Sequence, residues 1–194
     1  MRSIALVLGI ASVAGCSYLA RSPEPPSSEG TWATERDRYT RESKVYNVLA
    51  DVVFASATYQ AESVRAARVN RLADWKGMSQ GERDALLAKE LAEAADFDDF
   101  FIAFYTDDRR ANDLDRDPGT WRVSLLAAGR EVAPAKVELV QPNPTVQILY
   151  PYVDPFHRLY RIRFPRAKGA APLPTSPFEL RIAGAPGRVA MEWR

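Results

Sequence analysis

The sequence predicts an α+β fold in which an N-terminal helical hairpin packs on a seven-stranded antiparallel β-sandwich of immunoglobulin-like architecture. Two observations lead to this expectation. Between residues 35 and 75 apolar side chains recur mostly every three or four positions, which is the period of an amphipathic helix. After residue 97 they recur every second position, in short segments separated by Pro and Gly, which is typical of an antiparallel β domain.

Residues 35–97 are expected to form the helical hairpin. The first part contains no Gly or Pro before Gly77, so it predicts one long helix, or two helices with a break near Thr58. Ser79 and Glu82 then have the spacing of a capping box and start a second helix. Its predicted apolar face consists of Leu86, Leu87, Leu91, Ala94 and Ala95. The stripes either pack on each other and on the sheet or form an oligomeric coiled coil.

Residues 98–194 are expected to supply the seven strands. The alternating segments are Phe101–Tyr105, Trp121–Leu125, Val137–Gln141, Val146–Tyr150, Tyr160–Phe164, Phe178–Ile182 and Val189–Trp193. The first is apolar on both faces, so the helices should cover it. The short stretch from Gly184 to Gly187 predicts a hairpin between the last two strands. The sandwich architecture alone implies no function.

The chain begins with a segment that has the form of a secretory signal peptide. Met1 and the basic Arg2 precede an apolar run from Ile4 to Ala14. About 20 residues are needed to span a bilayer as a helix, so this run is too short to do so. Residues 1–15 are therefore interpreted as a signal peptide that is removed.

The four residues Val13-Ala14-Gly15-Cys16 closely resemble the lipobox of bacterial lipoprotein precursors. The resemblance implies that Cys16 becomes the mature N-terminus, carries a thioether diacylglycerol and an acylated amine such as a palmitoyl amide, and anchors the protein in a lipid bilayer. Ser17 follows the cysteine, and in the lipoproteins that this segment resembles a residue other than aspartate at this position usually goes with sorting to the outer membrane. The alternatives are an ordinary signal peptide, or a helix of the folded domain with Cys16 as a buried thiol.

Residues 16–34 are interpreted as the lipidated N-terminus and a tether rich in Pro and Ser. At about 3.1 Å per residue in the polyproline form, such a tether could hold the folded part about 50 Å from the membrane. Pro23 and Pro26 also have the PxxP spacing that proline-binding modules recognise. Tethers commonly have this composition, so the spacer interpretation is preferred.

Composition restricts the classes of partner. Without Arg2 the mature chain has 25 basic and 25 acidic residues, and a neutral total provides no electrostatic footprint for nucleic acid. Cys16 is the only cysteine. Once it is lipidated, neither an intramolecular disulfide nor a thiolate metal cluster can form.

A loop after the first predicted strand offers a weak metal site. Asp113, Asp115 and Asp117 alternate along the chain and could direct three carboxylates at one Ca²⁺, which takes six to eight oxygen ligands. An EF-hand loop would need glycine where Pro118 stands and glutamate where Ser124 stands. A solvated turn with internal ion pairs is the preferred interpretation.

The sequence provides little for catalysis. His157 is the only histidine, and neither a GxSxG nucleophile motif nor a glycine-rich phosphate loop occurs in the sequence. We therefore expect a protein that is not an enzyme. Because two of the 25 acidic residues could act as a pair, a hydrolase acting on cell-wall glycan stays open as the first alternative, and a calcium-stabilised module as the second.

The segment 150–160 is the candidate binding surface. It contains four aromatic residues and His157, and two prolines restrict its backbone. We therefore assign partner binding to Tyr152, Phe156 and His157, because aromatic side chains are enriched at interfaces. The alternative is that these rings fill the core. The overall hypothesis is an outer-membrane lipoprotein in the bacterial cell envelope that acts as a non-catalytic binding or assembly component with an envelope protein partner.

Overall fold

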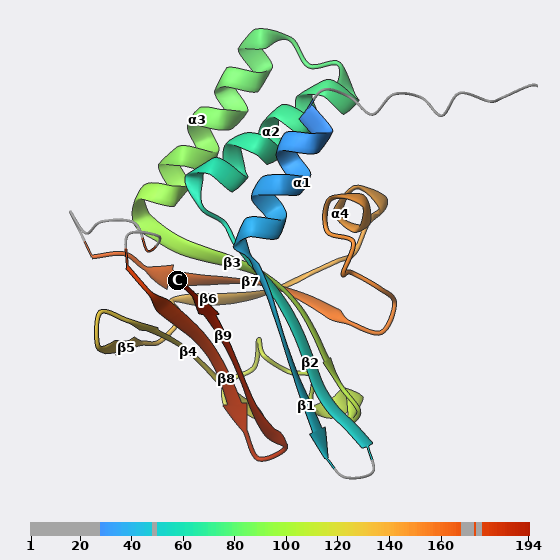
Figure 1. The fold of residues 1–194 in the computed structure, drawn as a ribbon, viewed down its shortest axis with the longest axis vertical. Helices are drawn as coiled ribbons and strands as arrows, with labels where there is room; N and C mark the ends of the chain where they lie inside the picture. Colours follow the sequence, from blue (N-terminus) through green and yellow to red (C-terminus); the bar gives the residue numbers. More distant parts are fainter. Residues whose placement is uncertain (1–27, 48–49, 168–172, 174–175) are drawn as a thin grey trace, which may run out of the picture.

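The computed structural model describes residues 28–47, 50–167, 173 and 176–194, so Cys16, the predicted lipidation site, lies outside the described residues. Within these ranges the chain is α+β (Figure 1). None of the described helices combines the length and the hydropathy needed to cross a membrane. In chain order the elements are α1 (Ser28–Tyr39), β1 (Thr40–Asn47), β2 (Ala50–Tyr59), α2 (Glu62–Lys76), α3 (Gln80–Asp96), β3 (Phe97–Thr106), η1 (Arg109–Ala111), β4 (Trp121–Ala127), β5 (Arg130–Val132), β6 (Lys136–Val140), α4 (Pro144–Leu149), β7 (Arg158–Pro165), β8 (Phe178–Gly184) and β9 (Gly187–Trp193).

The described strands form two antiparallel sheets. The five-stranded sheet has the order β1-β2-β3-β7-β6, and the four-stranded sheet has the order β5-β4-β8-β9. Aromatic side chains fill the space between the sheets. Phe100 on β3 lies 5.4 Å from Trp193 and 6.0 Å from Phe178, measured between ring centroids, and Phe104 lies 5.3 Å from Trp121. These rings come from both sheets, so the main core lies between them.

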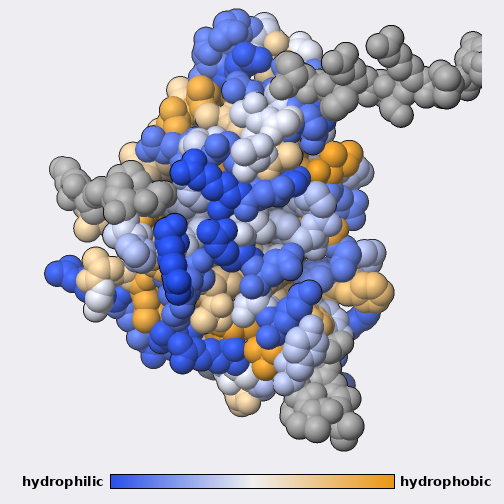
Figure 2. All heavy atoms as spheres, viewed as in Figure 1, coloured by the Kyte–Doolittle hydropathy of each residue, from blue (hydrophilic) through white to orange (hydrophobic). Residues whose placement is uncertain are grey.

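Helices cover part of the outer face of the five-stranded sheet. α1, α2 and α3 form one end of the molecule, and α4 lies beside α1 (Figure 1). α1 is mostly polar but buries Trp32, whose indole N–H donates to the carbonyl of Leu149 at 3.2 Å. Hydrophilic residues cover the tip of the helical end (Figure 2). The outer face is consequently covered at the helical end and open toward the β1–β2 end.

Charged side chains join α2 and α3 to the sheet beneath them. Arg65 on α2 is fully buried and contacts Asp99 on β3 at 2.7 Å and Glu90 on α3 at 2.9 Å. Arg161 on β7 contacts the same Asp99 and also Glu93 on α3. Burying a charge is costly unless it is paired and hydrogen-bonded, and the contacts with Arg65 and Arg161 pair the Asp99 carboxylate through its Oδ2. Oδ1 of Asp99 is buried without a hydrogen-bond partner among the described residues, with Nε of Arg163 3.8 Å away.

This cluster predicts a loss of stability in acid. The hydrogen bond from Arg161 lowers the pKa of Glu93 in the folded protein. A lowered folded-state pKa contributes stability above the unfolded-state value, about 4.3, and that contribution disappears as the pH falls through the lowered value. Glu93→Gln should therefore reduce the urea midpoint at pH 7 and make the midpoint less sensitive to pH below 4.5. Equal acid sensitivity in both proteins would contradict this.

The structure corrects the helix expected over 35–75. Residues 40–47 and 50–59 are two strands of a hairpin, and only 28–39 and 62–76 are helical. Val53, Ala55 and Ala57 face the core at every second position, and β2 pairs with both β1 and β3. The segment carries both the three- and four-residue spacing of a helix and the two-residue alternation of a strand. Pairing with β3 selects the strand.

The second helix begins as predicted, and its apolar face is only partly buried. Ser79 caps α3, accepting from the amide of Glu82, and the Glu82 carboxylate accepts from the amide of Ser79. Of the five residues expected on the apolar face, only Ala94 is buried, and Leu91 is exposed. Gly77 ends α2 in the left-handed conformation, which glycine adopts without steric cost.

Two further expectations are wrong in detail. Residues 28–34, expected to belong to the tether, are part of α1, so a tether can include only residues before 28. Val146–Tyr150, expected as a strand, coincides with helix α4. Asn143 caps this helix by accepting from the amide of Val146, and Pro144 occupies its first turn, where a missing amide proton costs nothing.

The other predicted strands correspond to β3, β4, β6, β7, β8 and β9. The turn at Ala128-Gly129 and the hairpin closed by Gly184 and Gly187 are also present. β1, β2 and the short β5 were not predicted as strands. The coarse class, α+β with two antiparallel sheets, is therefore confirmed.

Candidate functional site: an aromatic row on the open sheet face

Four side chains lie in one row across the open part of the five-stranded sheet. The register places Lys44 of β1 opposite Phe54 of β2, and Phe54 opposite Tyr105 of β3. Continuing the β3–β7 register places His157 opposite Tyr105, and their rings are 6.0 Å apart. Because residues directly opposite in adjacent strands project on the same face, these side chains form a continuous strip.

Tyr46 extends this strip toward the end of β1. Its ring lies 5.8 Å from that of Phe54, which in turn lies 5.6 Å from Tyr105. Tyr46 is 65% exposed, while the rings of Phe54 and Tyr105 are half-buried. The ammonium of Lys44 lies 5.6 Å from the centroid of Phe54, a cation–π contact. We call Tyr46, Phe54, Tyr105 and His157 the aromatic row.

The loop before β7 is held in place by Asp154. Its carboxylate accepts from the amide of Phe156 at 2.8 Å and from that of His157 at 3.1 Å, and lies 2.6 Å from Nδ1 of His157. Burial alone would raise the pKa of Asp154, but the hydrogen bonds from His157 and Phe156 outweigh it and the pKa is lowered. Phe156, 67% exposed, therefore projects from a restrained loop and directly precedes His157 of the aromatic row.

The rings of the aromatic row do not share a plane. The interplanar angle is 78° between Tyr46 and Phe54, 36° between Phe54 and Tyr105, and 59° between Tyr105 and His157. A flat ring such as a base or a sugar stacks best on parallel faces, whereas a ridged apolar surface interdigitates with side chains. The geometry therefore favours a protein surface over a flat ligand.

The three residues that the sequence analysis assigned to binding differ in their exposure in the structure. Phe156 is exposed and His157 joins the aromatic row, but Tyr152 is half-buried. The Tyr152 hydroxyl lies 2.7 Å from Oγ1 of Thr58, and burial raises its pKa well above the usual value. Its position against Phe101 and Tyr150 indicates a packing role.

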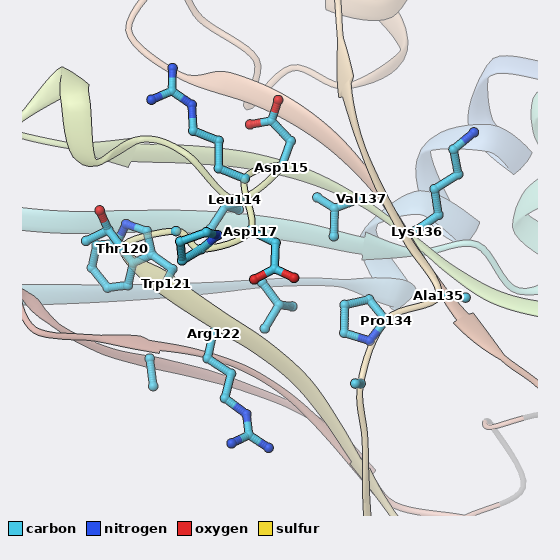
Figure 3. A pocket seen from close by; sticks show the side chains of 16 residues that line it. Leu114, Asp115, Asp117, Thr120, Trp121, Arg122, Pro134, Ala135, Lys136 and Val137 are labelled. Atoms are coloured by element: carbon cyan, nitrogen blue, oxygen red, sulfur yellow. The ribbon is translucent and has the colours of Figure 1, made fainter.

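A separate, concave region lies at the β6 edge of the five-stranded sheet, beside β4 of the other sheet. A cleft of about 640 Å³ opens between β4, the loop 114–120 and the segment 133–137 (Figure 3). The side chains of Asp115 and Asp117 point in opposite directions there (Figure 3). Asp113 is buried and accepts from the amide and the hydroxyl of Thr120, each at 3.1 Å.

The three aspartates considered for Ca²⁺ therefore do not converge. In the described part of the chain no group of three or more His, Cys, Asp or Glu side chains is placed to hold a metal ion. Asp113 closes its loop instead, because both its oxygens are used by Thr120. The alternation in the sequence was a weak guide, since loop residues seldom keep the regular directions of a strand.

Sequence reasoning missed Tyr46, Phe54 and Tyr105 as site residues. They are separated along the chain by up to 59 positions and meet only through strand pairing. The available signal was the alternation over 53–59, where Phe54, Ser56 and Thr58 stand between buried residues. Interpreting this segment as a helix placed Phe54 on the wrong element.

Comparisons with known proteins do not identify a family. No family model matches the sequence, and no curated protein matches it. The fold is similar to the crystal structure of a protein of unknown function from Burkholderia pseudomallei K96243. The TM-score is 0.45 with 9% sequence identity, over 86% of this chain and 83% of the other.

Proposed function

We propose that this protein is a lipid-anchored lipoprotein of the bacterial cell envelope that binds a partner protein through the aromatic row, without catalysing a reaction. The anchor is supported by the lipobox at Val13–Cys16, which follows a short apolar run. The contact surface is supported by one structural observation: aromatic side chains from three strands and a restrained loop lie side by side, with Tyr46 exposed and the other three partly exposed.

The sheet suits such a role because it is rigid. The two facing sheets form a sandwich scaffold, and its core fixes the backbone of β2 and β3 that carries Phe54 and Tyr105. Binding to a preformed surface loses little conformational entropy, and aromatic rings offer a large contact area with few rotatable bonds. The row is thus preformed and offers a large aromatic contact area, two properties that suit an interface hot spot.

The position of the row relative to the anchor favours a partner away from the anchoring bilayer. α1 begins near the helical end of the molecule, whereas β1 and β2 extend to the opposite end (Figure 1). Tyr46 lies near the far end of β1. Cys16 precedes α1 in the sequence, so the anchored chain enters the folded part at the helical end and the row lies toward the opposite end.

Replacement of the two most exposed rings tests the contact surface. Tyr46→Ser with Phe156→Ser should lower recovery of the partner from its own envelope more than tenfold, because each hot-spot ring contributes about 2 kcal/mol and 1.4 kcal/mol is a factor of ten. The melting temperature should change little, since both side chains are exposed. Recovery is measured by pull-down of the anchored protein and mass spectrometry.

Ile148→Ser is the matched control for this experiment. Ile148 is 60% exposed, apolar and located on α4, outside the aromatic row. It should retain full partner recovery. The proposal fails if the double variant keeps its partners, or if Ile148→Ser loses them to the same extent, because general surface hydrophobicity would then account for binding.

A further inference from the structure

The cleft beside β4 contains a free strand edge. β5 pairs only with Leu125, Leu126 and Ala127 of β4. The same register would place Pro134 opposite Val123, and proline has no amide proton to donate. The chain instead leaves β4 at this point and joins the other sheet as β6, with the amide of Ala135 donating to Arg163 on β7. Among the described residues, no strand pairs with the first half of β4 on this side.

The turn geometry shows which backbone groups face the cleft. Ala127 and Arg130 flank a two-residue turn in which both central residues, Ala128 and Gly129, have positive φ. In this hairpin type the flanking residues form a hydrogen-bonded pair, and such pairs alternate along an antiparallel ladder. The amide and carbonyl groups of Val123 and Trp121 therefore point to the same side as those of Ala127. Among the described residues, no backbone hydrogen bond joins them to the segment 133–135.

The cleft has the dimensions and the lining that one extended peptide needs. Its volume of about 640 Å³ is within the range of roughly 300–1,000 Å³ for ligand sites. Inward-facing side chains of such a peptide would meet apolar residues, Leu114 and Val137 among them, and outward-facing ones would meet Arg122. Figure 3 shows Arg122 pointing away from Val137, with the carboxylate of Asp117 between them in this view.

We propose that the cleft binds an extended segment of a partner protein, which adds as an antiparallel strand to Trp121–Val123 in the direction of β5. The bound segment would supply backbone donors and acceptors to Trp121 and Val123, including the amide donor that Pro134 lacks, as in other cases of β-strand addition. Small apolar residues at alternate positions fit the inner wall. This site is distinct from the aromatic row, and either can fail without the other.

The test uses the full-length chain with Cys16→Ala and a displayed library of linear peptides. In the free protein the Val123 amide should exchange with solvent at least tenfold faster than that of Leu125, which faces β5. Selected peptides should slow the Val123 exchange at least tenfold. Two sets of N-methylated peptides are compared, one methylated at the odd-numbered amides and one at the even-numbered amides. One set should bind at least tenfold more weakly, and the other should bind as tightly as the unmodified peptide.

That alternation distinguishes strand pairing from any other way of filling the cleft. Tyr46→Ser with Phe156→Ser should bind the selected peptides as tightly as the parent, since neither residue lines the cleft. Recovery of no peptide, peptides that leave the Val123 exchange unchanged, or equal effects of N-methylation in both registers would each overturn the proposal.

Discussion

Cys16→Ala should remove the protein completely from the membrane fraction, or leave an uncleaved precursor, if Cys16 is the lipidated residue. A single acyl chain holds a protein only reversibly and two or more hold it stably, at about 0.8 kcal/mol per buried methylene. Losing all chains therefore removes the whole anchoring energy. The measurement is carbonate washing of membranes followed by immunoblotting, with mass spectrometry of the N-terminal peptide for the lipid.

Ser17→Ala is the matched control, because it alters the neighbouring residue and keeps the cysteine. It should remain anchored and acylated. The folded part of Cys16→Ala should show the same melting temperature as the parent after delipidation, since the described core contains no residue before Trp32. A Cys16→Ala protein that stays in washed membranes would contradict the lipid anchor or show that a tight partner retains the protein.

Asp99→Ala should lower the free energy of unfolding by about 3 kcal/mol, the low end of the range for breaking one partner out of a buried ion pair. Asp99 is 1% exposed and is the partner that Arg65 and Arg161 share. After the substitution Arg65, fully buried, keeps only Glu90 and a carbonyl. The loss is measured as the shift in the urea unfolding midpoint.

A second substitution separates the unpaired charge from the loss of packing. Adding Arg65→Met to Asp99→Ala should recover part of the lost stability, because the double variant no longer buries an uncompensated guanidinium. Glu138→Ala, which removes a partly exposed partner 3.8 Å from Arg163, should cost less than about 1 kcal/mol. A double variant no more stable than Asp99→Ala would show that the charge is not the cause.

The C-terminal strands could be predicted because each encodes its own environment. In β8, Phe178, Leu180 and Ile182 face the core, and Glu179 and Arg181 lie between them. In β7 the alternation is the same, although its outward arginines meet carboxylates of α3 and β3. Local pattern and tertiary burial agree in these strands, and such agreement makes a sequence predictable.

The N-terminal half could not be predicted in the same way because its burial depends on distant partners. β1 is mostly polar, with Val45 and Tyr46 near its end, and it is the edge strand that pairs with β2, which in turn pairs with β3. α1 has almost no apolar face, and its contacts are with distant residues: the Trp32 indole donates to Leu149, more than 100 positions away, and the Tyr39 carbonyl accepts from Trp193. Neither element has the local periodicity that marks a helix or a strand.

The candidate site shows the same division. Phe156 and His157 were found because aromatic residues are dense along the chain there. The other three members of the row required the register of β1, β2 and β3, which no local pattern contains. Tyr152 was assigned with Phe156 by proximity in sequence, but its hydroxyl lies against Thr58 on β2, so it belongs to the packing under the loop.

Cross-linking in living cells tests the central claim most directly. A photoreactive phenylalanine analogue in place of Tyr46 should form adducts with one envelope protein, and Phe156→Ser in the same chain should reduce their yield more than tenfold. The same analogue in place of Ile148, equally exposed on α4, should form none with that protein. Adducts of equal yield from both positions, or adducts from position 46 that persist unchanged with Phe156→Ser, would contradict the aromatic row as the contact surface.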